Sequence, residues 1–401
     1  MRILHVTPSY EPAWHLGGVV RSVSQLCRGL AGLGHEVTVF TTDRGGDGRL
    51  AVPVNEPVQV GGVTVYYFKT DFFLKFAYSR SLGKACRLKT KDFDLVHLAS
   101  FWGYPEIPAV RWAKCYEIPY FVSTHGTFLQ YSMSQKALKK WVYYYLVEKA
   151  VLQGTRAIHY TAELEREGMG YLGLRPPSLV IPNGLALDEF QNLPESSAAR
   201  DVLCWEQGER IVLFLGRLHP RKGLSFLLEA FARAAASLPE LVLVLAGPDG
   251  GEENKLKRDA KRLGVAGRVR FPGFISPEKR NLYLRAADLC ALVTHPGENF
   301  GNAAVEAMLG GVPVLVSEHV GICREVAADG AGVVVPLSVE AISGALHNML
   351  ADPEGLGEMG RRAAESARRR YDIRVVAQMM ADAYEDILTG RRSPGLGWSD
   401  Q

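Results

Sequence analysis

Short hydrophobic runs alternate with amphipathic stretches along the whole chain. Runs such as IVLFLG at 211–216 and LVLVLAG at 241–247 are apolar without polar alternation, which is typical of parallel strands covered on both faces. Helical patterns lie between them, such as Val19–Leu33, which carries an apolar stripe and is followed by Gly34. This strand–helix–strand order predicts an α/β fold of open parallel sheets joined by right-handed crossovers.

The two halves of the chain repeat one plan. Each opens with a strand, a glycine-bearing loop and a helix: HVTPSYEPAWHLGGVV near the start and LFLGRLHPRKGLSFLL later on. We therefore expect two facing, doubly wound Rossmann-like domains, with a cleft between them at the C-terminal ends of both sheets. The expected divisions are a first Rossmann-like domain over 1–187, a second over 188–372, a helix over 373–390 returning to the first domain, and a mobile tail over 391–401.

Composition excludes several classes of protein. With 401 residues, 47% of them hydrophobic, the chain can build two cores and is not disordered. A net charge of +3 is too weak to indicate nucleic acid as a partner. The six cysteines form no CxxC pair, and no apolar run reaches the length of about 18 residues that a membrane span needs. Because MRILHVTPSYEP lacks a secretory pattern, we expect a protein that is cytoplasmic or bound peripherally to the inner face of the plasma membrane.

The stretch THPGENFGNAAVEAM at 294–308 predicts a helix that begins near Gly301 and Asn302. Its first backbone amides, with that of Phe300, would be unsatisfied donors that favour an anion such as phosphate. Glu298 and Glu306 would repel phosphate, so they are better suited to accept hydrogen bonds from sugar hydroxyls. A capping glutamate and a surface glutamate remain the alternative interpretation.

A second candidate for anion binding is GRLHPRKG at 216–223, where Arg217 and Lys222 flank a turn before another helix. Two cations at a helix entry can clamp a diphosphate, although a solvated basic turn has the same pattern. The loop holding Gly17 and Gly18 could add backbone amides. Neither GxxxxGK[ST] nor GxGxxG occurs, which disfavours a Walker-type site and a dinucleotide dehydrogenase.

Taken together, these segments resemble family 4 of the retaining glycosyltransferases, which have the GT-B fold. The resemblance covers nearly the whole chain. Its motifs are GGV at 17–19, DLVH at 94–97, STHG at 123–126, IPNGLALDEF at 181–190, GRLHPRKG, LAGPDG at 245–250 and E-x7-E from Glu298 to Glu306.

The resemblance implies a role for each matching residue. By this resemblance, 1–187 would be the acceptor-binding domain and 188–372 the donor-binding domain. Arg217 and Lys222 would bind the diphosphate of a nucleotide-sugar, Glu306 the ribose and Glu298 the sugar, with His125 facing that sugar from the acceptor-binding domain. His125, Arg217, Lys222 and Glu298 are thus the expected catalytic residues. The remaining expected donor contacts are Gly17, Gly18, Gly216, Ile275 against the base, Asn299, Phe300, Gly301 and Asn302. The family often has Gly where Asn299 stands and Ser where His295 stands, so the resemblance does not extend to the finer sugar contacts.

The implied activity is metal-independent, retaining transfer of a sugar from a UDP- or GDP-sugar to a hydroxyl acceptor, without a cofactor. The acceptor would be lipid-linked or a saccharide, in polysaccharide or glycolipid biosynthesis. The Asp-x-Asp at 92–94, a metal-binding mark in other transferases, leads here into the strand LVHLA. A GT-B nucleotide-sugar epimerase and a catalytically silent sugar-nucleotide-binding subunit of a polysaccharide assembly complex remain alternatives. A phosphorylase would need a pyridoxal-bearing lysine, which no motif identifies.

A basic and aromatic segment lies at 132–152. Lys136, Lys139 and Lys140 stand beside Trp141, and YYFKTDFFLKFAYSR at 66–80 repeats the mixture. Such a helix could lie on an anionic membrane surface or hold a lipid-linked acceptor. The alternative is an ordinary helix with its apolar face on the core and its lysines in solvent.

Overall fold

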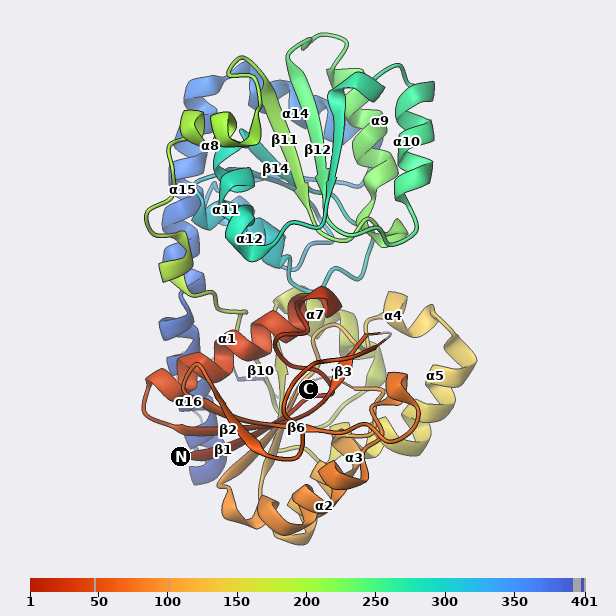
Figure 1. Cartoon of the computed structure of the whole chain (residues 1–401), viewed down its shortest axis with the longest axis vertical. Coiled ribbons are helices and arrows are strands. Elements are labelled where there is room, and N and C mark those ends of the chain that lie inside the picture. The colour runs from red at the N-terminus through yellow and green to blue at the C-terminus, as the bar shows by residue number, and fades with distance from the viewer. Residues whose placement is uncertain (47, 100, 392–397, 400–401) are drawn as a thin grey trace. The chain divides into compact units, whose positions relative to one another are not determined.

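The computed structural model describes residues 1–46, 48–99, 101–391 and 398–399 (Figure 1). The chain divides into two compact units, and the division falls between Leu185 and Ala186. Unit 1 comprises Met1–Leu185 and the segment from Ile373 onward, whereas unit 2 is Ala186–Asp372. Each unit holds one large sheet, parallel or nearly so, with helices on both faces.

The main sheet of unit 1 has, in the described part of the chain, the strand order β10-β9-β8-β7-β1-β2-β6-β5. Its strands pair in parallel, except that β5 runs antiparallel to β6 at the edge, a strand that the hydrophobic pattern did not predict. The order reverses between β1 and β7, which creates a crevice at their C-terminal ends. The strands are β1 (Arg2–Val6), β2 (Glu36–Thr42), β5 (Pro57–Val60), β6 (Val63–Phe68), β7 (Leu95–Ala99), β8 (Tyr120–Ser123), β9 (Ala157–Tyr160) and β10 (Ser178–Val180), beside a hairpin of β3 (Arg44–Gly45) and β4 (Gly48–Arg49).

The helices of unit 1 cover both faces of this sheet. The α-helices are α1 (Gly18–Gly32), α2 (Arg80–Lys89), α3 (Glu106–Cys115), α4 (Gln130–Ser134), α5 (Ala137–Tyr143), α6 (Lys149–Gln153), α7 (Glu163–Met169) and α16 (Ile373–Thr389). Shorter helical turns are η1 (Trp14–Leu16), η2 (Leu74–Phe76), η3 (Thr90–Asp92), the π-helical η4 (Tyr144–Glu148) and η5 (Gly170–Leu172).

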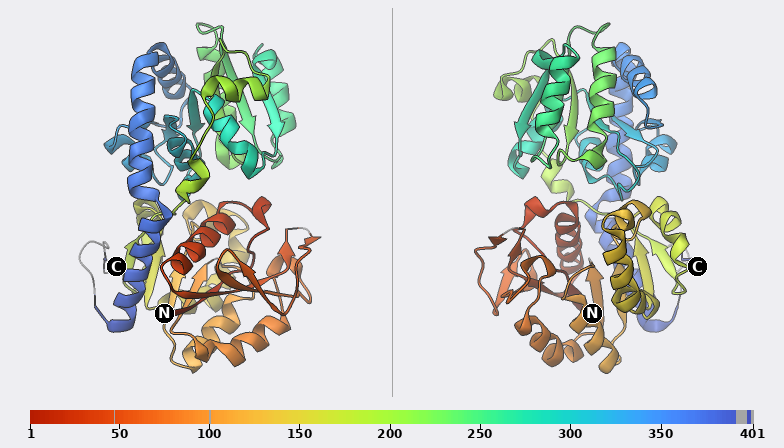
Figure 2. Two further views of the ribbon diagram at one scale, coloured as in Figure 1. Left: turned by 60° about the vertical axis from the view of Figure 1, so that its left-hand side comes forward. Right: turned by 90° about the vertical axis from the view of Figure 1, so that its right-hand side faces the viewer.

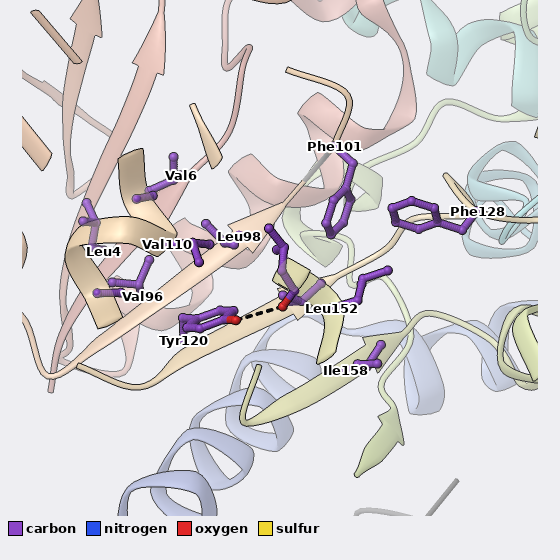
Figure 3. Packing of buried hydrophobic residues seen from close by; sticks show 14 of the residues in the cluster. Leu4, Val6, Val96, Leu98, Phe101, Val110, Tyr120, Phe128, Leu152 and Ile158 are labelled. Atoms are coloured by element: carbon purple, nitrogen blue, oxygen red, sulfur yellow. Dashed lines mark hydrogen bonds between the residues drawn. The ribbon is translucent and has the colours of Figure 1, made fainter. Parts of the chain in front are cut away.

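Alternate residues of the central strands face two separate hydrophobic clusters. Leu4 and Val6 of β1 belong to a cluster with residues of α2 and α3, in which the Tyr120 hydroxyl also donates to a backbone carbonyl (Figure 3). Ile3 belongs to the other cluster, with residues of α1 and α16, two helices that lie side by side (Figures 1 and 2). Burial of both faces explains why the strands lack polar alternation.

Part of the C-terminal tail is held against unit 1. Ser399 pairs with Ser178 of β10 through two backbone hydrogen bonds of 2.8 and 2.9 Å, and Trp398 Nε1 donates to Asp386 Oδ2 at 2.9 Å. The expectation of a mobile tail over 391–401 therefore does not hold for these two residues. Residues 392–397 and 400–401 of that stretch lie outside the described residues.

Unit 2 has a parallel sheet in the order β13-β12-β11-β14-β15-β16 across its described residues. Numbered within the unit this is 3-2-1-4-5-6, the order of a doubly wound nucleotide-binding sheet, and it reverses between β11 and β14. Ligands bind in such folds at the C-terminal ends of the two strands where the order reverses. The strands are β11 (Arg210–Leu215), β12 (Leu241–Ala246), β13 (Val269–Gly273), β14 (Leu289–Leu292), β15 (Val314–Ser317) and β16 (Gly332–Val335).

The helices of unit 2 pack against their neighbours on the sheet. Helix α9 contacts α10 and α14 (Figure 1), α15 contacts α14 and α12, and α11 contacts α8. The α-helices are α8 (Ser196–Leu203), α9 (Leu224–Ala234), α10 (Glu253–Arg262), α11 (Pro277–Ala286), α12 (Asn302–Leu309), α13 (Cys323–Ala328), α14 (Val339–Ala351) and α15 (Pro353–Tyr371). Short turns are η6 (Leu187–Phe190), η7 (Pro220–Lys222) and η8 (Ala266–Arg268).

Glycines let the loops at the C-terminal ends of β11 and β12 approach closely. Gly247 has a φ of +149°, and a Cβ atom there would lie 1.9 Å from the Gly216 carbonyl oxygen. The Gly216 amide in turn donates to the Ala246 carbonyl at 2.9 Å. A side chain at Gly247 would push the β11 loop away from the sheet, because a backbone atom cannot yield as a flexible side chain can.

We expect Gly247→Ala to lower the free energy of unfolding by about 2–4 kcal/mol, through the clash and the positive φ. Chemical denaturation followed by circular dichroism measures this. Gly344→Ala is the matched control, because Gly344 lies inside α14 and a Cβ there meets no atom within 4 Å. That change should raise stability by about 0.5–1 kcal/mol. Equal effects of the two substitutions would contradict the role of Gly247.

Candidate functional site

Two loops of unit 2 meet where the strand order of its sheet reverses. One follows β11 and contains η7, and the other follows β14 and leads into α12. The His295 amide donates to the Arg221 carbonyl at 2.9 Å, which ties the two loops together. Most residues expected to bind the donor lie in these loops, at the position where this fold binds ligands.

Lys222 and Glu298 form a direct ion pair between the two loops. Their side chains are only 16% and 14% exposed, so water screens the pair weakly. The sequence predicted that Lys222 binds diphosphate and that Glu298 binds sugar hydroxyls, as separate functions. It did not predict that the two would be partners.

Cations gather around this pair. Burial, followed by the nearby charges of Arg221 and Arg217, lowers the pKa of His219. His219 stays in place because its Nδ1 accepts the Arg221 amide at 3.2 Å, capping η7. Arg217 is exposed, in the loop after β11, and its stem lies close to Gly250. The loop thus presents positive charge beside the carboxyl of Glu298, as an anion-binding site requires.

The N-terminus of α12 adds backbone donors. Gly301 caps this helix with a φ of +102°, and a Cβ there would lie 2.7 Å from Val320. Within the described chain, the amides of Phe300 and Gly301 donate to no backbone carbonyl. The Phe300 ring is buried against Tyr371, which fixes the loop. Two amides at a helix N-terminus suit an oxyanion.

Glu306 is buried in α12 beside an arginine that sequence reasoning missed. Arg280 of α11 lies 3.5 Å from Glu306 and 3.0 Å from Glu189 of η6, and its guanidinium stacks over Phe190. Arg280 is itself buried, so it fixes the Glu306 carboxyl in one position. No local motif marks Arg280, because its partners lie 26 and 91 residues away.

Three of the other expected donor contacts lie at the same strand ends. Gly216 follows β11, half-buried Asn299 precedes Phe300, and Asn302 begins α12. Ile275 lies half-buried in the loop between β13 and α11, two strands away in the sheet from β11. Unit 1 holds Gly17 and Gly18, both exposed, where Gly17 caps α1 with a φ of +113°.

Metal ligation receives no support from the Asp-x-Asp. Asp94 accepts hydrogen bonds from the amide and the guanidinium of Arg2, at 2.7 and 3.1 Å, so it ties β7 to β1. Among the described residues, no group of three or more His, Cys, Asp or Glu side chains is placed to hold a metal ion.

His125 of unit 1 follows β8 with a φ of +46°, beside a small pocket. Register places three more histidines on the same face of neighbouring strands: His5 of β1, His97 of β7 and His159 of β9. All four line the pocket, together with residues of α1 and α16. The signal in the sequence is that strands β1, β7 and β9 each contain a histidine and that another, His125, follows β8.

A hydrogen-bonded chain connects two of these histidines, His159 and His97. Because His159 Nε2 lies 2.7 Å from the Ile181 carbonyl, Nε2 must donate, and Nδ1 then accepts from Ser123 at 2.6 Å. Ser123 in turn accepts from His97 Nε2 at 2.5 Å, and His97 Nδ1 accepts from Tyr384 at 2.6 Å. The Ile181 carbonyl therefore sets the tautomers of both His159 and His97, which are neutral in this arrangement.

The basic-aromatic segment of unit 1 faces two ways. Lys136 and Lys139 are exposed, but Lys140 donates to the Ser132 carbonyl at 2.5 Å and lies over the Trp102 ring. Trp141 packs against the hydrophobic cluster. Lys140 and Trp141 thus turn towards the protein, contrary to the expected outward-facing set. The large hydrophobic residues of this segment that face solvent are Leu138, Val142, Tyr145 and Leu146.

Comparison with known proteins agrees with this architecture. A family model described as "Glycosyl transferases group 1" matches residues 196–370, and one described as "Glycosyl transferase 4-like domain" matches 17–184. The phosphatidyl-myo-inositol mannosyltransferase of Mycolicibacterium smegmatis is 30% identical over 387 residues, covering 92% of this chain and 90% of that protein.

Two solved structures are similar to the whole chain. Sucrose-phosphate synthase from Thermosynechococcus elongatus superposes with a TM-score of 0.78 at 21% identity, covering 97% of this chain and 100% of that one. HepE from Anabaena, solved with UDP-glucose, superposes with a TM-score of 0.76 at 21% identity, covering 96% and 100%. At this identity the similarity establishes the fold, which is GT-B as the sequence predicted.

We expect the four buried histidines that line the pocket to make unit 1 sensitive to acid. Burial lowers the pKa of His5 and His125 to about 3 and that of His159 to about 4, from 6.5. The unfolded chain therefore binds more protons below pH 6.5, so stability is full above that pH and is lost as the pH falls towards 4. Each such histidine contributes a slope of about 1.4 kcal/mol per pH unit.

Urea unfolding at a series of pH values between these limits measures the slope. His159→Asn should reduce it by the contribution of one histidine, whereas His347→Asn, at an exposed site on α14, should leave it unchanged. A slope that is the same in His159→Asn and in the unsubstituted protein would show that this histidine titrates normally.

Proposed function

The chain belongs to family 4 of the glycosyltransferases, and from that premise we propose that it transfers a sugar from a nucleotide diphosphate donor to a hydroxyl acceptor with retention at the anomeric carbon. The observation that carries the proposal is the meeting of the two unit 2 loops. Together they hold Arg217, Lys222, Glu298 and the amide end of α12 at the reversal point of the sheet.

In the proposed reaction the bond from the anomeric carbon to the diphosphate oxygen breaks, and a bond to the acceptor oxygen forms on the same face. The acceptor's proton passes to the departing phosphate oxygen. Negative charge therefore develops on the leaving diphosphate, and the task of the protein is to stabilise it. Arg217, Lys222 and the Phe300 and Gly301 amides supply fixed positive charge and donors for this purpose.

Because Arg217 and Lys222 are positively charged, we propose that the reaction needs no metal ion or cofactor. A divalent ion that bridges diphosphate oxygens supplies positive charge, and Arg217 and Lys222 could supply it here. Glu306, fixed by Arg280, is suited to accept hydrogen bonds from the two ribose hydroxyls. We also propose His125 as a neutral hydrogen-bonding group for the sugar.

The similar proteins support a choice of substrates. HepE is solved with UDP-glucose, and the mycobacterial relative is named for mannosyl transfer to phosphatidyl-myo-inositol. We therefore propose a UDP- or GDP-sugar as donor and a lipid-linked or saccharide hydroxyl as acceptor, in glycolipid or polysaccharide biosynthesis.

We expect Lys222→Met to slow turnover roughly 10²–10³-fold at saturating donor, because it removes one preorganised charge from the leaving group. Thermal shifts with UDP, GDP and ADP first identify the base, and consumption of the matching nucleotide-sugar then gives the rate. Lys255→Met is the matched control, since Lys255 is an exposed lysine on α10 of the same unit.

Three outcomes would count against parts of this proposal. Near-normal turnover of Lys222→Met would remove Lys222 from the mechanism. Nucleotide binding without consumption of any donor would indicate a silent subunit, and epimerised donor without transfer would indicate an epimerase. The anomeric configuration of the product, read by NMR, tests retention.

We also propose that unit 1 contacts an anionic membrane surface. Leu138 and Leu146 are 83% and 75% exposed, and with Val142 and Tyr145 they recur at helical spacing through α5 and η4. Lys136, Lys139 and Lys149 flank this face, exposed as well. An apolar face bordered by cations is complementary to anionic lipid. None of the described helices is both long and apolar enough to span a bilayer.

We expect the protein to float with phosphatidylcholine vesicles that contain phosphatidylglycerol and not with pure phosphatidylcholine. Replacing Leu138 and Leu146 together by Gln should weaken flotation at least about tenfold, because each leucine loses its apolar transfer energy. Val202→Gln, at an exposed apolar site of unit 2, is the control. Flotation unaffected by the double substitution would place the contact elsewhere.

A further inference from the structure

We propose that Glu298 is the resident counter-ion of Lys222, which the donor diphosphate displaces, and that this exchange weakens the hold of the site on diphosphate. The inference rests on the proposed function, since it takes the Lys222 loop as the diphosphate site. It adds that Glu298 competes with the ligand for one cation, so removing its charge should tighten binding.

The geometry of the two loops holds Lys222 and Glu298 in contact with each other. Lys222 ends η7, and Glu298 lies in the loop that pairs with Val320 after β15, so backbone contacts hold both loops. Gly321 allows this pairing, because a Cβ there would lie 2.1 Å from the Asn299 carbonyl oxygen. Because the side chains of Lys222 and Glu298 are so little exposed, neither charged group can be solvated by water unless its side chain moves.

Electrostatics then sets the direction of the effect. A poorly hydrated ammonium needs an anionic partner, and leaving it without one is costly. A diphosphate entering the site gains the lysine but must first separate it from Glu298, which lowers the net gain. With glutamine at 298 the ammonium would have no charged partner, so an incoming anion would recover the full interaction.

The surrounding charges leave the rest of the site favourable to anions. Arg217 and Arg221 lie close enough to lower the pKa of His219, and Glu252 opposes them from the start of α10. Glu252 is itself 3.8 Å from Lys255. Glu298, in contrast, contacts the Lys222 ammonium of the η7 loop directly. Once the diphosphate displaces Glu298 from Lys222, the carboxylate oxygens become available to sugar hydroxyls. The exchange thus links diphosphate binding by Lys222 with sugar binding by Glu298, which the sequence predicted as separate functions.

The test is binding of inorganic pyrophosphate measured by calorimetry at fixed ionic strength, which needs no knowledge of base, sugar or acceptor. Glu298→Gln should bind pyrophosphate about tenfold more tightly than the unsubstituted protein. Lys222→Met should bind it more weakly, and Glu298→Gln should bring no gain in that background, because the competition no longer exists. Glu318→Gln, at an exposed glutamate after β15, controls for the change in net charge.

Each outcome has a separate meaning. Unchanged or weaker binding in Glu298→Gln, with normal thermal unfolding, would overturn the exchange. The same gain in the Lys222→Met background would show a general effect of charge and also overturn it. If Glu298→Gln does not fold, Glu298→Ala gives the same comparison. Absence of pyrophosphate binding in the unsubstituted protein would instead contradict the proposed function, because the phosphate site itself would be missing.

Discussion

The reversal of strand order in each parallel sheet is the constraint on which the rest of this protein depends. In unit 2 the chain leaves β11 towards α9 and leaves β14 towards α12, and the two exits lie side by side in the sheet. Backbone at such a point cannot be covered by a crossover, so its loops stay available to a ligand. Lys222 and Glu298, 76 residues apart, become partners for this reason alone.

Charge compensation is the second feature of unit 2. Several of its weakly exposed ionic groups are paired with one another: Lys222 with Glu298, and Arg280 with Glu306 and Glu189. Unpaired charges at these depths would lower stability.

Unit 1 uses the same topology with different chemistry. Its crevice is lined on one face by neutral histidines, whose hydrogen-bonded chain ends at a carbonyl and includes Tyr384 of the C-terminal helix. Such a chain fixes orientation without adding charge, which suits a surface that positions a neutral hydroxyl. Helix α16 is therefore part of the core of unit 1, because it supplies both apolar packing and this hydroxyl.

The sequence by itself determined the parallel sheets, the glycine-bearing loops and the position of the E-x7-E helix, because hydrophobic period and glycine placement act over a few residues. It also identified most of the residues at the reversal point of unit 2. It could not identify Arg280, the Lys222–Glu298 pair or the inward turn of Lys140 and Trp141. Only tertiary structure decided these, since a charged or aromatic side chain takes its partner from segments that the sheet brings together, and nothing in the local sequence encodes that choice.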